Sequence, residues 1–174
     1  RLSPMVPAAS VLVDASGKLH QAARTVSMSA PLAPEMFGFT RPSHYLVSAL
    51  NDAELFGSGG APLDVAVIEV DKARFRLTDS GSMDKFNPNN EPYPWPVTGS
   101  APWYEPTKEY PFANSNFHPS FPFSGQNMLS AWNALGQSEV DGVVTVDVSA
   151  VAAVLNVVGP IQTSGYGEVT ADNV

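Results

Sequence analysis

Three aspartates stand at the ends of segments rich in strand-forming residues, and their chemistry would be metal binding. Asp64 lies near the start of Leu63–Val70, while Asp141 and Asp147 flank the main part of Val140–Val146. Carboxylates gathered at neighbouring strand ends could hold Mg²⁺ together with a substrate phosphate. The alternative is that Asp147 caps the helix that follows it and that Asp64 and Asp141 face solvent.

Phosphoryl transfer sets a second requirement, because cationic groups must surround the phosphate. Arg74 and Arg76 are the only paired arginines, and the alternation of Ala73 to Thr78 places them on the outer face of a strand. Phe75 and Leu77 are then expected to face the core. The requirement is poorly met, so we assign no metal ligand and no cofactor, and Mg²⁺ enters only with a transferase alternative.

A polar cluster also follows the first predicted strand. Asn51 and Glu54 precede a glycine turn that ends with Gly59 and Gly60. Loops at strand ends often carry binding residues, and a glutamate there could bind a cation or accept a hydrogen bond from a sugar. The alternative is that Asn51 and Glu54 bond to backbone amides freed by the turn.

The segment from Ser80 to Pro122 combines nine prolines with interleaved aromatic residues. Prolines exclude helix interiors and central strands, and the aromatic side chains must be buried somewhere. We predict a long ordered loop laid across the sheet. Trp95, Trp103 and Tyr104 could stack on sugar rings or contact a proline-rich partner, or else fill the sheet's own core.

Composition excludes several classes of function. The chain has 174 residues, no cysteine and a formal net charge of −8. Thiol catalysis, thiolate zinc sites and disulfides are therefore excluded, and nucleic acid is a poor partner. No apolar run reaches the roughly 18 residues that span a bilayer, so direct membrane insertion is not expected here. The three histidines lack ligand spacing, and neither a Gly-x-Ser-x-Gly elbow nor a phosphate loop is present.

The predicted elements define an α/β or α+β fold with a mixed central sheet and flanking helices. Strands are expected at His44–Leu50, Leu63–Val70, Ala73–Thr78 and Val140–Val146, helices at Ser124–Leu135 and Ala150–Val157, and a small hairpin from Ile161–Thr163 and Glu168–Thr170. A helix between the two β-branched segments favours a crossover and a parallel pairing. We expect Leu63–Val70 and Val140–Val146 to lie side by side, covered on both faces.

The N-terminal part carries a different pattern. Apolar residues recur there at intervals of three and four: Met5, Ala8, Leu12, Ala15, Leu19, Ala22 and Val26. This stripe predicts an amphipathic helix over residues 4–27, which either continues a stalk or bundle or packs on the domain's own core. We therefore divide the chain into a helical segment, residues 1–33, and a mixed-sheet domain, residues 34–174, truncated at its C-terminal end.

Four blocks of residues, in order, resemble the hallmarks of the domain of unknown function 4012 family. They are Tyr45-Leu46-Val47 with Asn51, Ala53, Glu54 and Gly59-Gly60; Asn114, Asn116, Pro119 and Phe121-Pro122; Val140 to Val143 with Asp147 and Gly159-Pro160-Ile161; and Thr170 with Asn173-Val174. The resemblance covers the chain from about residue 44 to its end. It departs from the family at Phe56, where an arginine is usual, and at Asn114 and Ser120, where aspartates are usual, so any catalysis served by those charges would be lost here.

The resemblance implies a Gram-positive, often actinobacterial, envelope protein whose domain is extracytoplasmic and anchored by a membrane helix outside this stretch of chain. The last part is also similar, at the level of fold, to the LytR-CpsA-Psr phosphotransferases. The leading hypothesis is a domain that binds or tethers cell-wall glycan or glycopolymer. One alternative is a divalent-metal-dependent phosphotransferase acting on lipid-linked glycopolymer, and another is a structural or assembly module that contacts envelope proteins.

Overall fold

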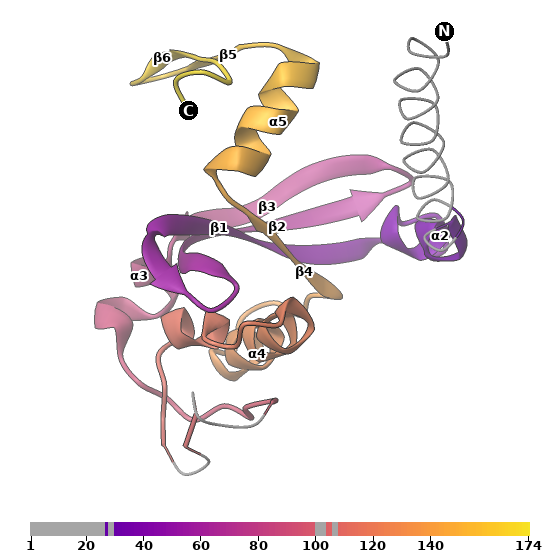
Figure 1. Cartoon of the computed structure of the whole chain (residues 1–174). Coiled ribbons are helices and arrows are strands. Elements are labelled where there is room, and N and C mark those ends of the chain that lie inside the picture. Colours follow the sequence, from indigo (N-terminus) through magenta and orange to yellow (C-terminus); the bar gives the residue numbers. More distant parts are fainter. Residues whose placement is uncertain (1–26, 28–29, 100–103, 106–107) are drawn as a thin grey trace, which may run out of the picture.

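The computed structural model describes residues 27, 30–99, 104–105 and 108–174. They form a four-stranded sheet with one long helix beneath it and a second above it (Figure 1). The strands are β1 (Ser43–Phe56), β2 (Gly59–Asp71), β3 (Arg74–Ser82), β4 (Gly142–Val146), β5 (Ile161–Thr163) and β6 (Gly167–Val169). The α-helices are α2 (Ala33–Met36), α3 (Met83–Phe86), α4 (Phe121–Ala134) and α5 (Val148–Val158), and the 3-10 segments are η1 (Ala30–Leu32), η2 (Pro88–Asn90) and η3 (Phe112–Asn116).

The sheet has the order β3-β2-β1-β4, with antiparallel pairs between the first three strands and a parallel pair between β1 and β4. This confirms the mixed sheet and the parallel pairing. The two β-branched segments share the sheet but are not neighbours, because β1 lies between β2 and β4. The reason is the hairpin turn at Gly57 and Ser58, which makes β2 the antiparallel partner of β1 and leaves only the far edge of β1 for β4.

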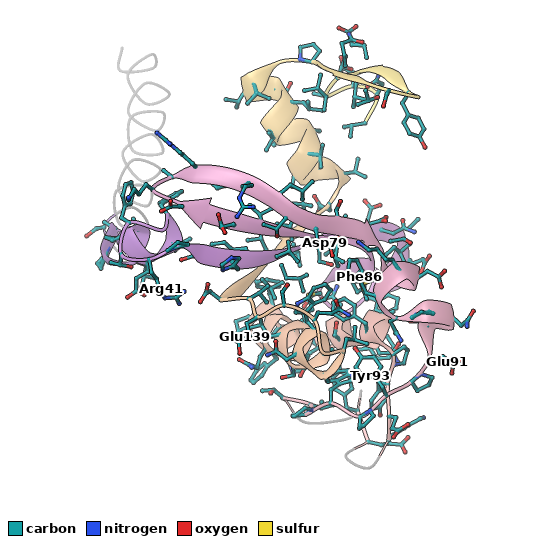
Figure 2. The ribbon with its side chains drawn as sticks, turned by 180° about the vertical axis from the view of Figure 1, so that it is seen from behind. Arg41, Asp79, Phe86, Glu91, Tyr93 and Glu139 are labelled. Atoms are coloured by element: carbon teal, nitrogen blue, oxygen red, sulfur yellow. The ribbon has the colours of Figure 1, made fainter. Side chains whose placement is uncertain are left out.

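The core lies between the sheet and α4. Leu46 of β1 and Val67 of β2 are paired across the sheet and are almost fully buried on the α4 side. Trp132 of α4 packs its ring 5.1 Å from that of Phe86, whose side chain is labelled between the sheet and α4 in Figure 2. Helix α4 forms because Met128, Ala131 and Trp132 recur at helical spacing and are all buried on this side.

The proline-rich and aromatic loop is ordered where it is described, as predicted. Tyr93 and Tyr110 form an isolated antiparallel bridge, and the Tyr93 hydroxyl donates to the carbonyl of Ala131 in α4 at 3.0 Å. Trp95 and Tyr104 belong to the same hydrophobic core. This middle part of the loop packs on α4 and not, as predicted, across the sheet, whereas α3 and η3 at the two ends of the loop contact β2.

The opposite sheet face differs from the prediction. Phe75 and Leu77 are 65% and 61% exposed, so the expectation that they face the core is wrong. Leu63–Val70 is likewise not covered along its whole length on both faces, since Val65, Val67 and Val70 are buried while Leu63 and Asp64 are exposed. The strand register explains the error, because Phe75 pairs with Val70 and Leu77 pairs with Ile68, and these two β2 residues lie on the face opposite Val67. Phe75 and Leu77 therefore lie on the face turned away from α4, and the bulge at Thr78 shifts the alternation only from Asp79 onward.

The C-terminal elements match the prediction. Helix α5 follows Asp147, and β5 and β6 form the expected hairpin. Within the described residues no helix is long and apolar enough to cross a bilayer. The predicted helix over residues 4–27 falls outside the described part except for residue 27, so the division into residues 1–33 and 34–174 stays a prediction.

Candidate functional site

A cleft of about 440 Å³ opens where the ends of β1 and β3 and the start of β2 meet the short helical segments η2 and η3. We call it the Glu54 cleft. It is lined by Glu54, Phe56, Pro62, Leu63, Ser82, Met83, Asp84, Asn87, Asn89, Asn90, Ala113 and Asn114. Its polar groups are thus two carboxylates, four amides and a hydroxyl, and no lysine or arginine is among these lining residues. The cleft joins residues of the first two sequence blocks.

The first block supplies Glu54 on an irregular part of β1. The pairing of β1 with β2 shifts between Asn51 and Leu55, so the residues between them leave the regular ladder. The Asn51 amide donates to Glu54 Oε1 at 3.3 Å, and Asn51 Oδ1 accepts from the backbone N–H of Ala53 at 3.2 Å. Asn51 therefore shapes the strand end, and Glu54 is the member of the pair that lines the cleft.

The glycines that follow serve close packing. A Cβ on Gly60 would lie 2.1 Å from the carbonyl oxygen of Asn51, which no side chain can do. The carbonyl of Gly60 accepts a hydrogen bond of 2.7 Å from the buried amide of Asn116. Gly59 has a φ of 124°, a conformation that favours glycine. Both glycines support the site without lining it.

The opposite wall is built from asparagines. Asn87 is buried, and its amide donates to the carbonyl of Glu91 while its Oδ1 accepts from the N–H of Phe112, so it ties two loop segments together. Asn89 and Asn90 adopt φ values of 58° and 54°, which asparagine tolerates better than most residues. This wall was not predicted, and its one signal in the sequence is the Asn89-Asn90 pair.

Asn114 completes the wall from the second block. Its backbone carbonyl accepts a hydrogen bond of 2.6 Å from the Tyr104 hydroxyl, and burial raises the pKa of Tyr104 to about 12. This hydroxyl therefore stays protonated as a donor and fixes the backbone that carries the Asn114 amide into the cleft.

The three candidate aspartates lie apart from Glu54 and from one another. Asp64 is exposed in β2, opposite Ala49. Asp147 caps α5, where its Oδ1 accepts from the N–H of Ala150 at 2.7 Å. Asp141 pairs with Arg41. The described ranges contain no group of three His, Asp or Glu side chains able to hold a metal ion, so these three aspartates do not form the cluster considered from the sequence.

The two tryptophans of the predicted aromatic site have different outcomes. Trp95 is buried and donates its indole N–H to the carbonyl of Tyr110 at 2.8 Å, with the Tyr104 ring 6.0 Å away. It is a core residue and presents no free face to a sugar. Trp103 lies outside the described residues.

Sequence reasoning missed a second cleft, of about 530 Å³, at the sheet edge. Arg41 and Glu139, both labelled in Figure 2, line it together with His44 and Asp141. Asp141 accepts hydrogen bonds from Arg41 and from the backbone N–H of His44, and the Arg41 contact is the main reason why the pKa of Asp141 is lowered. The same ion pair raises the pKa of Arg41.

This charged edge continues along the α4 side of the sheet. Glu69 lies 3.4 Å from the His44 imidazole and accepts two hydrogen bonds from Arg76, which lower its pKa. Glu69 and Arg76 are paired across β2 and β3. Arg41 is thus paired with Asp141 and Arg76 with Glu69, and we therefore regard this edge as structural.

Comparison with known proteins identifies one family. The family model described as "Protein of unknown function (DUF4012)" matches residues 41–174. No curated protein and no solved structure matches the chain. The matched range includes every described residue of both clefts.

Proposed function

The chain belongs to the DUF4012 family of proteins of unknown function, and on that premise we propose that its Glu54 cleft binds cell-wall glycan or glycopolymer without chemistry of its own. The observation that supports this proposal is the lining of the cleft. Carboxylates and amides are the groups that bond sugar hydroxyls, and apolar side chains pack against the C–H faces of sugar rings. Glu54 and Asn114 supply the first kind of group, while Phe56 and Leu63 supply the second.

The dimensions of the cleft fit a small ligand. Its volume of about 440 Å³ lies within the range of about 300–1,000 Å³ that ligand pockets occupy. The cleft is open to solvent, so a chain of sugars could enter and leave through it. A domain that binds an internal stretch of a polymer needs such access.

The phosphotransferase alternative is less well supported. A phosphate would meet Glu54 and Asp84 in this cleft without a lysine or arginine among the lining residues, and this repels an anion. Phe56 occupies the position where relatives are expected to carry an arginine, and its ring packs 4.9 Å from that of Phe117. The arginine pair considered from the sequence does not serve the cleft either, since Arg76 is engaged with Glu69.

The compartment is part of the same proposal. We infer an extracytoplasmic domain, anchored by a membrane helix outside this stretch of chain, from the resemblance to envelope proteins. A protease added to intact cells would then cleave this domain in the full-length protein. Protection in intact cells, with cleavage only after lysis, would place the domain in the cytoplasm and remove the glycan from its reach.

The proposal predicts that soluble N-acetylhexosamine oligosaccharides prepared from cell walls bind in this cleft. Replacing Asn114 by Ala removes an amide from the wall and should weaken binding by about tenfold, the equivalent of one hydrogen bond to a ligand hydroxyl. Glu54→Gln keeps the shape of the side chain and should weaken binding less. Isothermal titration calorimetry measures both effects.

The control is Glu168→Gln in β6, an exposed carboxylate outside the cleft, which should bind as the wild type does. Equal affinities for all four proteins would contradict the proposal, as would the absence of heat at millimolar oligosaccharide. Pyrophosphate with Mg²⁺ is titrated in parallel. Binding of that pair, abolished by Glu54→Gln, would favour the transferase alternative instead.

A further inference from the structure

The sheet face turned away from α4 is apolar and uncovered over much of its area. We call it the open face. Strand pairing places Tyr45 beside Ile68 and Ile68 beside Leu77, while Val47 lies beside Val144 on the other flank. Leu77 and Val144 are 61% and 44% exposed. These neighbouring side chains form one continuous apolar surface across all four strands. Such a patch differs from the singly scattered apolar residues that protein surfaces normally carry.

Helix α5 adds to this surface. It stands over the β4 end of the open face (Figure 1), and among its residues only Leu155 is buried. Val154 is 58% exposed and Val157 is 85% exposed. Apart from Ser149 and Asn156 the helix consists of apolar residues. A helix with so much apolar surface is normally buried, so α5 and the open face indicate that another element covers them.

The chain itself approaches this face. Helix α2 is fixed at one end of it, because the Tyr45 hydroxyl donates to the carbonyl of Met36 at 3.1 Å and the Ser43 hydroxyl donates to that of Glu35 at 2.7 Å. The backbone of Phe37 accepts a further bond of 2.8 Å from the N–H of Ala73 in the β2–β3 turn. The start of the continuously described chain, from Ala30 to Phe37, therefore lies beside one end of the open face.

Residues 5–26 have the sequence pattern of a helix with one apolar side, which could pack on an apolar surface. Seven of their apolar residues, from Met5 to Val26, recur every three or four positions. A helix over these 22 residues would be about 33 Å long, while a strand as long as β2, with 13 residues, extends about 43 Å. We propose that residues 5–26, which lie outside the described residues, pack their apolar stripe on the open face.

Charge favours this occupant over a second copy of the chain. Residues 1–26 contain three basic side chains and one acidic side chain, and the other 148 residues contain six basic and sixteen acidic ones, a formal net charge of −10. The segment and the domain therefore attract each other, whereas two copies of a chain of charge −8 repel. Covalent connection also raises the local concentration of the segment to about millimolar.

Cysteine cross-linking tests the proposal in the full chain, which has no cysteine of its own. Leu77→Cys is combined with one of three changes in the stripe: Leu12→Cys, Ala15→Cys or Leu19→Cys. The matched controls combine Leu77→Cys with Ser10→Cys or Gln21→Cys, which helical geometry places on the opposite side of the segment. A disulfide needs Cβ atoms about 3.8 Å apart, so only a docked stripe cross-links efficiently.

We expect at least one stripe pair to form an intramolecular disulfide in the monomer at ten or more times the rate of the controls. Cross-linked dimers would show that a second copy covers the face, and equal rates for stripe and control pairs would show that the segment does not dock; either outcome overturns the proposal. Hydrogen exchange gives an independent readout. Leu12→Glu with Leu19→Glu should speed exchange in β3 and α5 but not in α4, and uniform or unchanged exchange would contradict the proposal.

Discussion

At Gly60 the neighbouring backbone leaves no room for any side chain. An added Cβ would meet three backbone atoms of Asn51 and Asp52 within 2.6 Å, and backbone cannot move aside as a flexible side chain can. The strand end that carries Glu54 therefore requires glycine at position 60.

Gly60→Ala should lower the free energy of unfolding by about 3 kcal/mol or more, the upper range for overpacking, as measured by urea denaturation. Gly125→Ala is the control, since a Cβ there meets its nearest neighbour, the Phe121 ring, at an ordinary 3.7 Å. That change should be neutral or stabilise by up to about 1 kcal/mol, as expected for a helical position. Equal losses for the two variants would contradict the packing argument.

Asp141 supports a prediction about pH. Its pKa is lowered in the folded chain, chiefly by the hydrogen bond from Arg41, so the stability it adds is present above the unfolded pKa of about 3.9. This stability is lost as the pH falls through the lower folded value. Asp141→Asn should thus be less stable than the wild type at pH 7, and the difference should shrink below about pH 4.

Thermal unfolding between pH 2 and pH 8 measures this difference. Asp172→Asn removes an exposed carboxylate near the C-terminal end and serves as the matched control. A constant gap between wild type and Asp141→Asn at every pH would show that the ion pair with Arg41 does not stabilise the fold.

At the scale of elements, helix α5 depends on its cap. Asp147 Oδ1 accepts from the N–H of Ala150 at 2.7 Å, and the loss of such an acceptor costs about 0.5–2 kcal/mol. Asp147→Ala should lose this amount in urea denaturation, while Asp147→Asn, which keeps an acceptor, should lose little. If Asn proved as damaging as Ala, the carboxylate would have a role other than capping.

The elements also show what sequence patterns can and cannot predict. The β-branched run in β2 and the cap at Asp147 have local causes, and both were predictable. The faces of β3 were not, because Phe75 and Leu77 pair with Val70 and Ile68, and only the packing of α4 on the other side of the sheet decides that this face stays open. The sequence left open whether Trp95 fills the core or contacts a ligand, since a pattern of aromatic residues does not say which rings are buried.

At the scale of the whole molecule, the fold separates two surfaces. The Glu54 cleft lies where the ends of β1 and β3 meet the start of β2 and the helical segments, while the open face lies across the strands beneath α5. The candidate site could be predicted only in part. Glu54 was predicted from its position after a strand-forming segment. Asp84, Asn87 and Asn89 were not predicted, because their segment has no periodic pattern. Their convergence on Glu54 is a consequence of the complete chain path.

Backbone amide shifts in a ¹H–¹⁵N NMR titration with N-acetylhexosamine oligosaccharide test most directly whether the cleft is the binding site. We expect the largest changes at Glu54, Asp84, Asn90 and Asn114, with the amides of the edge cleft, Arg41 and Asp141, unaffected. Changes confined to the edge cleft or to the open face, or none at saturating sugar, would contradict the assignment of glycan binding to the Glu54 cleft.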